Sequence, residues 1–206
     1  MRRTTRLFVS VMGAWMGLAG IEHGIGEILQ GNVIPEGIMI LSWPDSAFFQ
    51  NLSGEPAMTI VPNLLFTGIL AVLFSLLFAG WSILYVHHKH GGLVLMLLAI
   101  PMLLFGGGIF PPILGLLIGA AATRIPTAPR PGPVTGLNRL LGKGWPWVFA
   151  ACCVAWLALL PGVAVLGYFF EIDQVGVILT IMVAAFSLLL LAYLSSLRRD
   201  RLELIS

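Results

Sequence analysis

The sequence has few charged residues for its length and only two cysteines. Asp, Glu, Lys and Arg make up 10% of the 206 residues, whereas about 25% of a typical soluble domain is charged. This scarcity, together with 58% hydrophobic residues, excludes an ordinary soluble domain and indicates helices that face lipid or one another. Cys152 and Cys153 are adjacent in an apolar run, so they indicate free thiols and exclude a disulfide framework.

The signatures of several enzyme and ligand classes are also missing. No His-Glu-x-x-His zinc motif and no Gly-x-Ser-x-Gly nucleophile elbow occurs. The glycines of residues 136–144 have the wrong spacing for a phosphate-binding loop, and no Ser or Thr follows the lysine. No lysine lies inside an apolar stretch, which excludes a retinal Schiff base. The net charge of +2 is too small to indicate nucleic-acid binding.

The charges that are present fall in separate blocks of opposite sign. The basic blocks are Arg2/Arg3/Arg6, Lys89, Arg124/Arg130/Arg139/Lys143 and Arg198/Arg199/Arg201. Of the acids, only Asp200 and Glu203 share a block with arginines. Short loops rich in Lys and Arg stay on the cytoplasmic side of a membrane. The pattern therefore predicts a multi-pass protein of the inner (cytoplasmic) membrane, in contact with the lipid bilayer, with both termini cytoplasmic.

The apolar stretches between the charged blocks predict the membrane spans, each of which needs roughly 20 residues. Four stretches qualify, namely residues 7–29, 60–86, 145–170 and 175–197. We expect residues 30–59 to form an external loop, in which Ser42 or Asp45 caps a short interfacial helix. We expect residues 124–144 to form a cytoplasmic tether rich in proline and glycine.

Residues 91–123 are too long for one span and contain three consecutive glycines, Gly106–Gly108, followed by Pro111-Pro112. These residues predict a turn between two short arms, Leu93–Phe105 and Ile113–Thr123, either as two spans or as a re-entrant hairpin. A segment that enters and returns keeps all eleven basic residues cytoplasmic. The predicted fold class is therefore all-α: one transmembrane helical bundle of nominally six helices, with four full spans and one short hairpin.

A polar cluster lies in the last third of the first predicted span. His23 and Glu27 are four residues apart and share one helix face. Ionisable residues within spans are costly and usually face the bundle interior or a water-filled path. We expect an outward-facing polar pocket, in which His23 and Glu27 could hold a divalent metal or relay protons; no other cofactor is predicted. The residues of this pocket are Glu22, His23, Glu27, Asn63, Thr67 and Gly107. The alternative is that the span ends near Ile21, which leaves residues 22–30 in the solvated interface.

Glycines recur along one face of the same predicted span, at Gly13, Gly17, Gly20 and Gly24. Small residues at this spacing allow helices to approach closely in membranes. The seam predicts close helix packing, and it offers a contact surface for a membrane-protein partner or a second copy of the chain.

Three stretches resemble those of an uncharacterised family of small polytopic membrane proteins from bacteria and archaea. They are Gly20–Asn32, Gly54–Ile60 and Gly106–Leu114, and the likeness covers roughly residues 1–125. The resemblance implies a prokaryotic membrane protein and implies no activity or site.

The leading functional hypothesis is a small transporter or substrate-capture subunit that holds a cation or small polar solute in the acidic outer pocket. The second is a non-catalytic subunit or assembly factor of a larger membrane complex. The third is an intramembrane enzyme acting on lipid, with His23 and Glu27 as an acid/base pair, but the sequence supplies no nucleophile beside them. The sequence favours a protein that is not an enzyme.

Overall fold

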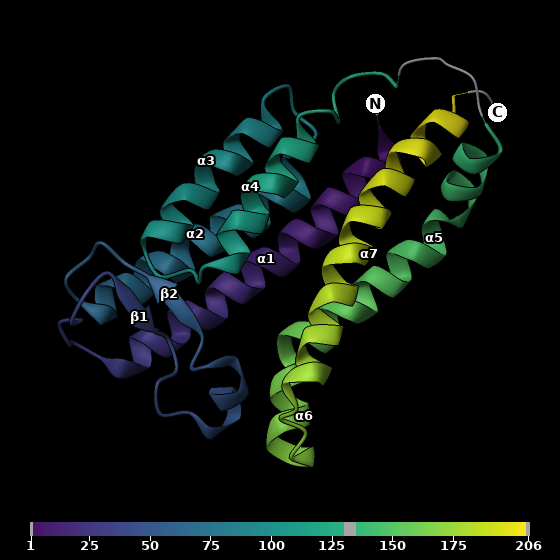
Figure 1. Cartoon of the computed structure of the whole chain (residues 1–206). Coiled ribbons are helices and arrows are strands. Elements are labelled where there is room, and N and C mark those ends of the chain that lie inside the picture. The colour runs from purple at the N-terminus through teal and green to yellow at the C-terminus, as the bar shows by residue number, and fades with distance from the viewer. Residues whose placement is uncertain (1, 130–134, 205–206) are drawn as a thin grey trace. The chain divides into compact units, whose positions relative to one another are not determined.

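The described residues are mostly helical, as Figure 1 shows. The computed structural model describes residues 2–129 and 135–204. They form two compact units, a larger one of residues 9–124 and a smaller one that combines residues up to Phe8 with those from Ile125 onward. Helix α1 (Arg3–Gln30) contributes to both units. Each unit is described by itself.

Among the described residues, four helices are long and apolar enough to cross a membrane, by length and composition. They are α1, α2 (Leu64–Leu84), the continuous helical stretch Gly136–Phe170 and α7 (Val175–Leu202). Helices α3 (Gly91–Leu104) and α4 (Phe110–Ala122) are also apolar but shorter. Every one of the predicted helical stretches is thus helical in the structure, with ends that differ by a few residues in most cases.

In the larger unit, α1 and α2 pack antiparallel along the glycine seam. A Cβ added at Gly17 would lie 2.6 Å from the Ala79 Cβ, and one added at Gly24 would lie 2.8 Å from the Gly68 carbonyl oxygen. Distances this short mean that the two helices approach closely only because these positions carry no side chain. The seam is filled by α2 of the same chain, so a partner or a second copy would have to use another surface.

Helices α3 and α4 lie side by side as the expected hairpin (Figure 1). Gly106 and Gly108 have φ values of +88° and +80°, which favour glycine and permit the tight reversal. The expectation that Pro111 and Pro112 belong to the turn is wrong, because α4 already begins at Phe110. Proline fits the first helical turn, where the missing N–H would have no partner within the helix.

The connection between α1 and α2 contains a small β-hairpin that the sequence analysis did not predict. Strand β1 (Met39–Leu41) pairs antiparallel with β2 (Pro56–Met58), and a short 3₁₀ helix, η1 (Ala47–Leu52), lies between them. The predicted caps of this short helix are wrong: Ser46 precedes it, without a capping side-chain hydrogen bond. The Ser42 hydroxyl is used elsewhere, as a donor to Glu27.

In the smaller unit, α5 (Gly136–Leu157), a π-helical turn η2 (Ala158–Gly162) and α6 (Val163–Phe170) form one continuous stretch that packs against α7. Helix α5 begins earlier than the predicted tether allows, because the Thr135 hydroxyl accepts a hydrogen bond from the Asn138 N–H and caps the helix. Residues 136–144 are therefore helical. Residues 130–134 of the predicted tether lie outside the described residues.

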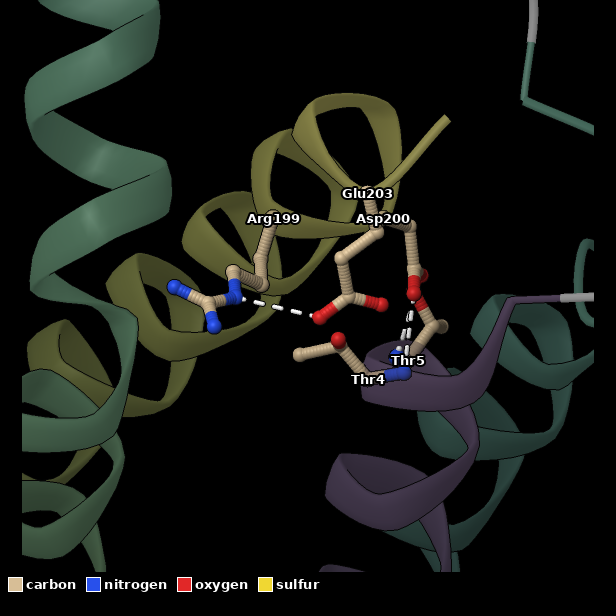
Figure 2. Close-up of polar contacts among 5 residues, drawn as sticks. All are labelled: Thr4, Thr5, Arg199, Asp200 and Glu203. Carbon is tan, nitrogen blue, oxygen red and sulfur yellow. Dashed lines mark hydrogen bonds and ion pairs between the residues drawn. The ribbon is translucent and has the colours of Figure 1, made fainter. Parts of the chain in front are cut away.

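The start of α1 is capped by a carboxylate from the other end of the chain (Figure 2). The backbone N–H groups of Thr4 and Thr5 donate to the two oxygens of Asp200 at 2.8 and 3.1 Å, and the Thr5 hydroxyl donates to Oδ2 at 2.5 Å. The first N–H groups of a helix have no partner within it, and a negative charge there is favoured by the helix dipole. This contact accounts for an acid among the C-terminal arginines; the other, Glu203, pairs with Arg199 at 3.1 Å.

We expect the substitution Asp200→Asn to destabilise the protein by about 1–3 kcal/mol. The NH₂ group of the new amide would replace one carboxylate oxygen, so at least one of the groups of Thr4 and Thr5 that now donate to Asp200 would lose its acceptor. Glu203→Gln is the matched control: its pair with Arg199 is exposed, so its removal should change the free energy of unfolding by about 0.5 kcal/mol or less. Denaturant titration of the detergent-solubilised protein measures both. Equal effects of the two substitutions would contradict the capping role of Asp200.

A second pair of substitutions tests the packing of α1 on α2. We expect Gly24→Ala to cost about 1–3 kcal/mol, because the new methyl group would meet the backbone of α2. Gly80→Ala, in α2 itself, has nothing within 4 Å of the added Cβ. It should stabilise by roughly 0.5–1 kcal/mol, since alanine is the better helix former. Melting temperatures of the two variants should therefore move in opposite directions, and parallel shifts would contradict the packing.

Candidate cation site

The polar centre of the larger unit is His23, which is 4% exposed near the C-terminal end of α1. Its Nδ1 lies 2.9 Å from the Ala19 carbonyl oxygen and 3.1 Å from Oε2 of Glu22. Its Nε2 lies 3.3 Å from Oε2 of Glu55. The imidazole ring is therefore held between two carboxylates, one from its own helix and one from the β-hairpin.

The hairpin places Glu55 with an unusual backbone conformation. Glu55 has φ +57°, and Ser53 and Gly54 before it also have positive φ values. Left-handed conformations are disfavoured for residues other than glycine, and they persist only where the surrounding structure enforces them. Here the enforcing contact is an extension of the β-ladder, in which the Ser42 N–H donates to the Glu55 carbonyl at 3.0 Å. The strained loop end thus presents Glu55 to His23.

Glu22, His23 and Glu55 each offer a ligand atom, and these three atoms lie within 4.8 Å of one another. With Nδ1 donating to the Ala19 carbonyl, Nε2 presents a lone pair toward the Glu55 carboxylate. Two lone pairs at that distance need a proton or a metal ion between them. Histidine ligands commonly donate their other ring N–H to a backbone carbonyl or carboxylate, as Nδ1 does here. The geometry is therefore suited to a bound cation.

Glu27 lies one helical turn from His23 and is fully buried. Its Oε1 accepts a hydrogen bond from the Ser42 hydroxyl at 3.2 Å, while its Oε2 is buried without a hydrogen-bond partner. The turn between α3 and α4 covers both side chains. A Cβ at Gly106 would overlap the Glu27 carboxylate, and a Cβ at Gly108 would lie 2.7 Å from Nε2 of His23. The glycines of this turn leave room for the two polar groups.

The charge of the cluster is strongly unbalanced. Between Arg6 and His87 the sequence contains five carboxylates, and His23 is its single basic residue. Three of these carboxylates, Glu22, Glu27 and Glu55, belong to the cluster. The negative end of the α1 dipole adds to the same potential. Even a protonated His23 leaves a negative excess, which favours a cation in this place.

The structure brings together only part of the predicted pocket. Glu22 and His23 are in contact, and Glu27 lies beside them under the glycine turn. The others have structural contacts elsewhere: Asn63 caps α2 and bonds to Asn32, Thr67 bonds to the Thr59 hydroxyl at 2.8 Å, and the Gly107 N–H donates to the Met102 carbonyl at 2.8 Å. Metal binding by His23 and Glu27 stays a prediction.

Glu55 is the residue that the sequence analysis missed. It lies far from His23 in sequence, within the Gly54-Glu55-Pro56 stretch of an irregular loop. A carboxylate between glycine and proline is a weak signal, and no helical or strand periodicity connects it to α1. The loop also contains a cavity of about 420 Å³, but none of the residues that line it, among them Leu41, Asp45 and Gly54, belongs to the cluster.

Comparisons with protein-family models, curated proteins and solved structures find no match to this chain. Any functional assignment therefore has to come from the geometry and charge of its own residues.

Proposed function

We propose that this chain is a multi-pass membrane protein that captures a divalent metal cation at Glu22, His23 and Glu55, as a small transporter or its substrate-capture subunit. The observation that carries the proposal is the convergence of the three ligand atoms in a segment with no lysine or arginine. Buried charges in proteins are paired or coordinate metals. His23 alone is too little positive charge for the carboxylates around it.

The surface of the long helices supports the membrane assignment. Large apolar side chains in the middle of these helices are exposed, including Leu76 at 54%, Val183 at 63% and Leu190 at 60%. In the most apolar part of helix α7, only 11% of the residues are buried. Such continuous apolar surface is unfavourable in water and is expected where lipid covers it.

The distribution of charge along each unit supports the proposed sidedness. In the larger unit, the end with the β-hairpin carries the acids, and the opposite end carries Lys89 and Arg124. In the smaller unit, Glu171 and Asp173 lie in the connection between α6 and α7, while the basic residues lie near the start of α5 and the end of α7. By the positive-inside rule, the termini are cytoplasmic and the cation site faces the other side.

The ligand set points to a transition-metal ion such as Zn²⁺, Mn²⁺ or Co²⁺. Imidazole nitrogen is a good ligand for these ions, and carboxylates complete their sites. Ca²⁺ prefers 6–8 oxygen ligands, so a histidine between two carboxylates is a poor match for it. The cation class therefore follows from the presence of His23.

The alternative hypotheses have less support. An accessory subunit that docks through the glycine seam would need that face to be free, and α2 covers it. A lipid-modifying enzyme would need a nucleophile paired with a base, but the nearby Ser42 is fully buried and its hydroxyl donates to Glu27. Neither hypothesis explains why the carboxylates gather around one histidine.

We expect the purified protein in detergent to bind one Co²⁺ or Zn²⁺ per chain in isothermal titration calorimetry, and to bind Ca²⁺ much more weakly. His23→Gln and Glu55→Gln should each lower the affinity by at least about tenfold, because each removes a ligand. Glu36→Gln is the matched control: it removes an exposed acid from the same connection and should leave the affinity unchanged. A wild-type protein that binds no transition metal, or an equal loss in Glu36→Gln, would refute the proposal.

A further inference from the structure

We infer that Glu27 is the fourth protein ligand of this site, and that it turns onto the cation beneath the glycine turn of the α3–α4 hairpin. This inference rests on the proposed function, since it concerns the same bound ion. In the structure, Glu27 lies outside the group of three ligand residues whose atoms converge.

The Glu27 carboxylate is only partly hydrogen-bonded. It is fully buried, and a single neutral hydroxyl, that of Ser42, donates to one of its oxygens. The other oxygen, Oε2, has no partner. Leaving a buried carboxylate oxygen unpaired is costly, and such groups are normally paired or bound to metal. A cation shared with His23 would satisfy Oε2.

Glu27 and His23 are covered by the same turn, Gly106–Gly108. Residues four apart on a helix have Cβ atoms about 5–6 Å apart and share a face. Gly106 lies against Glu27, and Gly108 lies against His23. This turn is fixed in place, because the Gly106 N–H donates to the Met58 carbonyl at 2.8 Å and ties it to strand β2. The same short segment therefore encloses both side chains from the same side.

Ser42 contacts both Glu27 and Glu55. Its hydroxyl donates to Oε1 of Glu27, and its backbone N–H donates to the carbonyl of Glu55. One residue thus positions carboxylates from two distant segments relative to each other. Oε1 stays held while Oε2 remains free to bind. Four ligands, one imidazole and three carboxylates, would also complete the coordination number that Zn²⁺ and Co²⁺ commonly adopt.

The test uses Co²⁺, because its visible absorption spectrum reports the number and type of its ligands. The full-length protein in detergent is titrated with Co²⁺ as wild type, Glu27→Gln, Glu27→Asp and the control Glu36→Gln. We expect Glu27→Gln to bind one Co²⁺ with an affinity lowered about 10–100-fold and with a changed visible spectrum. Glu27→Asp, which keeps the charge on a shorter side chain, should be intermediate. Glu36→Gln should match the wild type in both measurements.

A Glu27→Gln variant with wild-type affinity and spectrum would overturn the inference, while leaving the three-residue site intact. A wild-type protein that binds no Co²⁺ would instead remove the proposed function itself. A merely structural role for Glu27 would lower the melting temperature without altering the Co²⁺ spectrum. If Glu27→Gln yields no folded protein, the spectrum of Glu27→Asp decides: no change from the wild type overturns the inference.

Discussion

In the larger unit, the arrangement of the side chains around His23 is governed by a shortage of positive charge. Between Arg6 and His87, this histidine is the sole basic residue among five carboxylates. Its imidazole lies within hydrogen-bond reach of Glu22 and close to Glu55, so it holds helix α1 and the β-hairpin together. One imidazolium can neutralise only one carboxylate. The remaining charge has to be met by water, a proton or an added cation; water reaches the partly exposed Glu22 and Glu55 more easily than the buried Glu27.

The two buried carboxylates of the described chain, Glu27 and Asp200, differ in how many hydrogen-bond donors surround them. Asp200 accepts three hydrogen bonds, two of them from the positive end of the α1 dipole, so both of its oxygens are satisfied. Glu27 lies near the negative end of the same helix, with one neutral donor and one unpaired oxygen. The surroundings of Asp200 are those of a structural contact. The surroundings of Glu27 leave one oxygen without a donor, and this contrast is the reason we propose a ligand for Glu27 and not for Asp200.

Much of the helical framework could be predicted from sequence, because apolar length, glycine runs and charge blocks are local properties. The hairpin of α3 and α4 and the shared face of His23 and Glu27 are of this kind. The β-hairpin was missed, since strands of three residues are too short to show alternation. Glu55 and Asp200 act across long sequence separations, which periodicity does not report. The early start of α5 depends on a single capping threonine, Thr135, in a stretch that proline and glycine made look irregular.

The short α3–α4 hairpin and the proposed cation site lie at the same place in the larger unit. At about 1.5 Å per residue, the 14 and 13 residues of these helices cover roughly 20 Å, less than the hydrocarbon thickness of a bilayer of about 30 Å. Irregular backbone at membrane depth is tolerated only where protein or a polar cavity surrounds it. In this protein Gly106 lies against Glu27, Gly108 lies against His23, and the Gly106 N–H donates to strand β2, so protein atoms would shield the turn if it lay at that depth. A helix of full length in this place would carry side chains where the carboxylate and the imidazole now lie. The interruption between α3 and α4 thus leaves the space that the Glu27 and His23 side chains occupy, and the cation binding proposed above depends on that space.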